Sequence, residues 1–159
     1  MLKMFRSKKG FSLVELIVVI AILGVISAIA IPSALNILKD SKVKADIATA
    51  QSIVKSMNLA VVSANSDTNP DNNIEPIGPI DLNELDDGDQ LTIELKKAFP
   101  NIQEMTTQSG NSQFSIQIVN LDDFEGNVTF AFDGTQYTID QTGKMTSAPV
   151  GEGGEGGES

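Results

Sequence analysis

The stretch that decides the fold is Lys8-Lys9-Gly10-Phe11-Ser12-Leu13-Val14-Glu15-Leu16, together with the apolar run that continues to Leu38. Leu16 to Leu38 is 23 residues without a charge. As a helix this run would be roughly 34 Å long, against about 30 Å of bilayer hydrocarbon. The basic opening, Met1 to Gly10, is typical of a segment that stays in the cytoplasm while the apolar run enters the membrane.

Glu15 stands near the start of this apolar run. A charge in a membrane segment is unfavourable, and such residues are usually functional and paired. If the chain were cut between Gly10 and Phe11, the new α-amine of Phe11 would be a cation at the end of the same helix. It could then neutralise Glu15 of a neighbouring chain. Two simpler interpretations are a secreted protein that starts at Ile31, after a loose A-x-A site, and an uncut membrane anchor.

The segment from Lys8 to Leu16 resembles the class III leader junction of type IV pilins and of the related type II secretion pseudopilins. The family pattern is a short basic leader, Gly at the cut, Phe next, Glu at the fifth mature position and a long apolar helix. Counted from Phe11, Gly24 falls at position 14 and Pro32 at position 22, where the family commonly weakens or kinks the helix. The motif covers about a sixth of the chain.

The resemblance implies a maturation route. A prepilin peptidase would cleave between Gly10 and Phe11 and N-methylate Phe11, and Glu15 would pair with the Phe11 amine of a neighbouring subunit. The chain would first sit in the cytoplasmic membrane as a single-pass protein, with its leader in the cytoplasm and its head outside. The pilus or secretion assembly machinery would then draw it into a helical filament of identical subunits.

The rest of the chain divides by composition. We expect a leader at 1–10, a transmembrane or filament-core helix at 11–38, and an amphipathic continuation at 39–64. A connecting region at 65–112 holds a short helix near 91–99, an antiparallel sheet occupies 113–146, and 147–159 is a disordered acidic Gly/Glu tail. One apolar stripe marks the amphipathic half: Val43, Ile47, Ala50, Val54, Met57 and Val61.

Alternating apolar residues predict three half-buried strands, around 114–119, 128–132 and 136–140. Asp133-Gly134 is a strong two-residue hairpin turn between the last two. The fold class predicted is therefore α+β, with one long N-terminal helix packed on a small antiparallel sheet of three to four strands. The type IV pilin fold implied by the resemblance has the same layout.

Composition excludes several functions. The chain has no Cys and no His, which removes thiolate chemistry and the commonest general base. The formal charge is −10, and loss of the four leader cations would make it −14, which argues against general nucleic-acid binding. We expect no enzyme activity, since no Gly-rich phosphate loop or pocket-forming pattern accompanies the acids.

Acidic residues cluster between 81 and 89, and hard cations such as Ca²⁺ favour oxygen ligands. The spacing fails the EF-hand pattern, so solvated loop acids are favoured over a structural Ca²⁺ site, for which Asp86, Asp87 and Asp89 are the candidates. We expect no other cofactor or metal.

The function predicted is a type IV pilus subunit that serves adhesion, motility or DNA uptake. The alternatives are a type II secretion pseudopilin, and a membrane-anchored or secreted binding domain.

Overall fold

The computed structural model describes residues 11–66, 74–110 and 112–150. The expected leader at 1–10 and residues 151–159 of the expected tail lie outside this part. The chain divides into two compact units, Met1–Asp40 and Ser41–Ser159, which are described separately below.

Helix α1 spans Leu13–Ser66 as a single 54-residue element. Pro32 lies inside it and has no N–H, so it cannot bond the carbonyl of Ala28. The helix nevertheless continues through this position, and the Ser33 hydroxyl donates to the Ile29 carbonyl at 3.2 Å. Pro32 therefore removes one backbone hydrogen bond without interrupting the helix.

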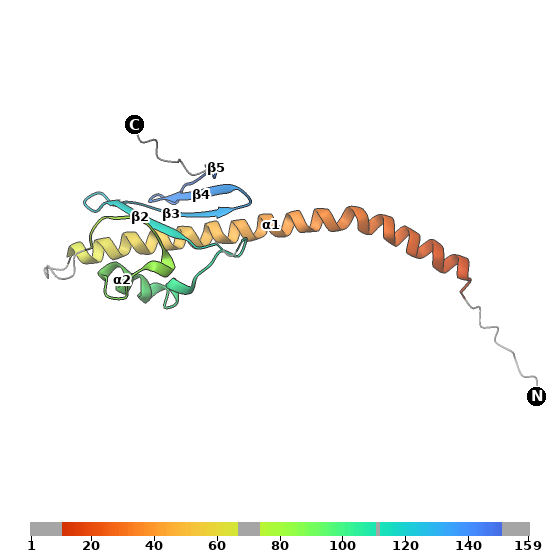
Figure 1. The fold of residues 1–159 in the computed structure, drawn as a ribbon, viewed down its shortest axis with the longest axis horizontal. Helices are drawn as coiled ribbons and strands as arrows, with labels where there is room; N and C mark the ends of the chain where they lie inside the picture. Colours follow the sequence, from red (N-terminus) through yellow and green to blue (C-terminus); the bar gives the residue numbers. More distant parts are fainter. Residues whose placement is uncertain (1–10, 67–73, 111, 151–159) are drawn as a thin grey trace, which may run out of the picture. The chain divides into compact units, whose positions relative to one another are not determined.

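The second half of α1 is amphipathic as predicted. Ala50, Val54, Met57 and Val61 are buried, and Ile47 packs against them half-buried. They form one core with inward residues of the sheet, which lies along this half of the helix (Figure 1). The core therefore lies between the apolar face of the helix, which recurs every 3.6 residues, and the inward face of the strands, which recurs every two residues.

The sheet is antiparallel with strand order β1-β2-β3-β4-β5. Its strands are β1 (Ile77–Asp81), β2 (Ser115–Asn120), β3 (Glu125–Phe132), β4 (Thr135–Asp140) and β5 (Met145–Pro149). The α+β fold class is thus confirmed, as a long helix packed on an antiparallel sheet.

The prediction of three to four strands was wrong, because both edge strands lack an alternating pattern. β1 contains Gly78 and Pro79, and lies partly in a segment that was interpreted as irregular. β5 is exposed along its whole length, so no buried face marks it in the sequence. Residues 147–149 consequently belong to the sheet and not to the expected disordered tail.

The turn between β3 and β4 confirms the predicted hairpin. Asp133 has φ of 50° and Gly134 has φ of 73°, while Phe132 pairs with Thr135. Two positive φ values in a two-residue loop match the twist of the flanking strands.

Helix α2 (Gln90–Ala98) begins and ends one residue before the helix expected near 91–99. It contributes Leu91 and Leu95 to the core. Short 3₁₀ turns, η2 (Leu82–Glu84) and η3 (Ile102–Glu104), flank it and bury Leu82 and Ile102.

Both edges of the sheet carry proline. In β1, Pro79 lies where the pairing register with β2 shifts between Ile77 and Ile80. In β5, the Val150 N–H just beyond the strand donates inward to the Gly134 carbonyl, so the alternation of an antiparallel ladder turns Pro149 outward. Proline offers no donor to a further strand, and edge prolines are a common protection against strand-to-strand association.

Candidate functional site

The start of α1 is held by Ser12 and Glu15. The Ser12 hydroxyl accepts a hydrogen bond from the Val14 N–H at 3.3 Å, and the Glu15 carboxylate accepts one from the Ser12 N–H at 3.1 Å. This reciprocal arrangement is a capping box, in which S-x-x-E satisfies two free N–H groups at a helix N-terminus. Sequence analysis missed this role, although the spacing Ser12 to Glu15 carries it.

Glu15 therefore lies at the positive end of the helix dipole, where a carboxylate is favoured. The carboxylate of Glu15 accepts the N–H of Ser12, the residue that follows Phe11. Phe11 itself is 85% exposed. Of the predicted site residues, Glu15 lies in the first turn of α1 and Phe11 lies two residues before the helix begins. Gly10 lies outside the described residues.

The apolar half of α1 is uncovered. Every residue from Phe11 to Asp40 is exposed, and large apolar side chains point to all sides of the helix. Leu13–Ala64 holds an 18-residue window of mean hydropathy 2.9, none of it buried, so by length and composition this helix is able to cross a membrane. An exposed apolar surface of this kind indicates a membrane or protein interface.

Gly24 and Pro32 both lie within this exposed half. A Cβ built on Gly24 would meet nothing within 4 Å, so no contact with the described part of the chain requires glycine there. Its effect on the isolated chain is confined to the backbone, since Gly lowers helix propensity by about 1 kcal/mol relative to Ala.

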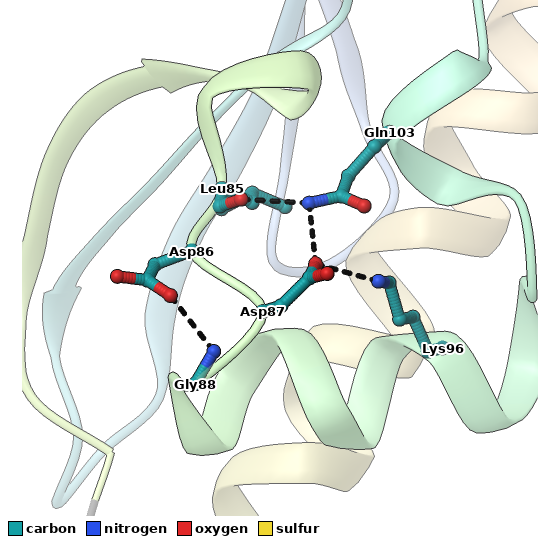
Figure 2. Close-up of polar contacts among 6 residues, drawn as sticks. All are labelled: Leu85, Asp86, Asp87, Gly88, Lys96 and Gln103. Atoms are coloured by element: carbon teal, nitrogen blue, oxygen red, sulfur yellow. Dashed lines mark hydrogen bonds and ion pairs between the residues drawn. The ribbon is translucent and has the colours of Figure 1, made fainter.

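The acidic loop before α2 is organised by hydrogen bonds within the protein. Asp87 accepts from Lys96 Nζ at 2.6 Å and from Gln103 Nε2 at 2.8 Å, while Asp86 accepts from the Gly88 N–H at 2.8 Å (Figure 2). Gln103 also donates to the Leu85 carbonyl at 2.7 Å. The pKa of the Asp87 carboxyl lies below its ordinary value of 3.8, chiefly because Lys96 and then Gln103 donate to it.

The three Ca²⁺ candidates are not brought together. Asp87 joins the Lys96 ion pair, Asp86 closes its own turn, and Asp89 precedes α2 without a side-chain cap bond. Across the described ranges, no three acidic side chains gather as a ligand set. Asp86 and Asp87 act here as loop-building residues.

Asp46 is the buried acid that sequence analysis passed over. It is 1% exposed, and its two oxygens accept the N–H groups of Gln108 at 2.7 Å and Ser109 at 2.9 Å. The loop that it holds is also tied to the sheet, where Ser112 Oγ donates to the Ala131 carbonyl at 2.9 Å. Its position beside Ile47 on the buried face of α1 was the available signal.

Comparison with known proteins adds one match. Residues 5–31 match the family model of the prokaryotic N-terminal methylation motif. No curated protein and no solved structure matches the chain. The matched range contains Gly10, Phe11, Glu15 and Gly24, and over that part of the chain it supports the resemblance to type IV pilins and pseudopilins. With the exposed apolar helix, it indicates membrane anchoring.

Asp46→Ala should destabilise the head, since a buried polar group left without its partner costs about 1–3 kcal/mol and two N–H groups lose theirs. Asp46→Asn keeps one acceptor oxygen and should lose less. Denaturant unfolding of the detergent-solubilised chain measures both, with the exposed Asp123→Ala as a control variant. Equal stability of Asp46→Ala and the parent chain would contradict the role assigned to Asp46.

The Asp87–Lys96 pair should make head stability depend on pH in the acid range. Because the folded pKa of Asp87 is below 3.8, its contribution is present above that value and is lost as the pH falls through the folded pKa. Asp87→Asn should flatten this part of the profile, measured as the Tm between pH 5 and pH 2. A profile with the same slope in the variant and the parent would contradict the assignment.

Proposed function

We propose that this protein is the structural subunit of a type IV pilus. The observation that carries the proposal is a match to the N-terminal methylation motif on a helix whose following apolar half is uncovered on every side. The second half of the same helix belongs to a folded head with its own core. In such a chain the apolar half of α1 would assemble into the filament, and the head would form the filament surface.

Maturation in this proposal begins in the cytoplasmic membrane. A prepilin peptidase cleaves between Gly10 and Phe11 and methylates the new Phe11 amine, with the leader in the cytoplasm and the head outside. Cleavage before the apolar segment keeps that segment on the mature chain, as anchor and then as filament core. The finished filament would serve adhesion, motility or DNA uptake at the cell surface.

Assembly exchanges lipid for protein around the apolar helix. The gain from each contact is modest, because lipid tails are already apolar. Register therefore has to come from polar groups, and Glu15 is the acidic residue in the first turn of α1. In the proposed filament the Glu15 carboxylate forms an ion pair with the Phe11 ammonium of a neighbouring subunit. This ion pair replaces, or is added to, its hydrogen bond with the Ser12 N–H.

The capping box lets two roles of Glu15 be separated by substitution. Glu15→Gln keeps an oxygen able to cap Ser12 but removes the charge, since a capping box accepts Glu or Gln. Glu15→Ala removes both. Loss of one partner of a buried ion pair costs about 3–5 kcal/mol, so both variants should give few filaments. Both should still be processed normally, because the cleavage site between Gly10 and Phe11 is unchanged.

The measurement is filament yield by shearing and electron microscopy, with N-terminal sequencing of the membrane fraction. Ser12→Ala is the matched control, because it removes the other half of the cap and leaves the charge; it should assemble. Normal yield from Glu15→Gln would overturn the charge-pair role. Long surface filaments support a pilus, whereas short assemblies confined to the envelope would identify the pseudopilin alternative.

A further inference from the structure

An acidic hollow lies beside the solvent face of α1 in the head. It has a volume of about 440 Å³ and is lined on the helix side by Asn58, Val61 and Val62. Its other wall is the loop from Leu121 to Glu125, with Gln141 at the margin. Three exposed carboxylates surround it, those of Asp122, Asp123 and Glu125.

The loop wall has a fixed shape. Phe124 lies so close to Gly126 that a Cβ on residue 126 would be 2.8 Å from the ring atom Cζ. Phe124 packs against the core, and the Asp122 N–H donates to Asn120 Oδ1 at 3.0 Å. The carboxylates on either side of the ring are therefore presented from a packed turn.

Apolar surface borders the same hollow. Val62 is 53% exposed, and Leu59, one turn earlier on α1, is 69% exposed. Most large apolar residues of the head are in the core, so these two stand out on a helix face that the sheet leaves open. A ligand that combines a cation with an aliphatic stem would use both the carboxylates and this apolar border.

The chain itself carries such groups on the same helix face. Lys44 and Lys55 are exposed, and they lie about five and two helical turns before Val62, which places all three on one side of α1. We define Lys44 and Lys55 as the lysine face. Among the described residues neither makes an ion pair, whereas Lys96 and Lys97 are held by Asp87 and Glu94.

We propose that the acidic hollow of one subunit receives the lysine face of a second copy of this chain. The inference rests on the proposed function, in which subunits share one orientation because their apolar helices share one environment. Two parallel copies displaced along the helix axis bring the lysine face of one beside residues 58–62 of the other. The displacement is roughly 10 Å for Lys55 and roughly 27 Å for Lys44, at 1.5 Å per residue.

The contact joins two different surfaces, so the first copy still has a free lysine face and the second still has a free hollow. An interface of this heterologous kind repeats without closing when the rotation between copies does not form a ring, and generates a helical filament. It also opposes the repulsion between subunits, whose mature formal charge would be −14.

Disulfide trapping tests the contact directly, because the native chain has no cysteine. Two differently tagged full-length chains are co-expressed, one with K44C or K55C and the other with D123C, and filaments are oxidised. We expect a mixed dimer from filaments with at least one of the two lysine positions and none from detergent-solubilised monomers. K97C with D123C is the matched control and should give none.

Charge exchange provides the second readout. K44E/K55E and D122K/D123K should each lower filament yield at least severalfold, and the two sets combined in one chain should restore it. Intact filaments without mixed dimers above the control, together with unchanged yield in the reversed variants, would overturn the proposed contact while leaving the pilin function standing. Processed parent chain that forms no filaments would overturn the proposed function itself.

Discussion

One constraint governs the rest of the structure: within the described residues, the large apolar side chains in the first half of α1 are left exposed. Every residue from Phe11 to Asp40 is exposed, on a segment apolar enough to cross a membrane. Water is a poor environment for such a surface, so lipid or other copies of the helix must cover it. The roles proposed for the maturation motif and for the head both follow from this requirement.

The head, in contrast, buries most of its own apolar residues. Its core is closed by the second half of α1, the inward residues of the sheet, α2 and the two 3₁₀ turns. Its loops are held by internal bonds such as those of Asp46 and Asp87. Prolines at both sheet edges limit association through strands. The contact proposed between heads uses side chains on the open face of α1 and on the acidic loop next to it.

Sequence predicted the parts of the fold that carry a strong period or turn signal. The amphipathic stripe of α1, strands β2 to β4 and the Asp133-Gly134 hairpin all follow from local pattern. β1 was missed because Gly78 and Pro79 interrupt any alternation between its half-buried Ile77 and Ile80, and β5 was missed because it has no buried face. Asp46 was missed because its partners, Gln108 and Ser109, are more than 60 residues away in the chain. The cap formed by Ser12 and Glu15 follows the S-x-x-E spacing and could have been predicted from the sequence.

The most direct test of the central claim is the intact mass and N-terminal sequence of the protein purified from its native membranes. A mature chain that begins at N-methylated Phe11 is the predicted result, because only cleavage after Gly10 keeps the apolar helix and creates a cation beside Glu15. A chain that begins at Ile31 would mean a secreted domain without the helix. An intact Met1 in cells with active prepilin peptidase would mean a simple anchor, and would contradict the account.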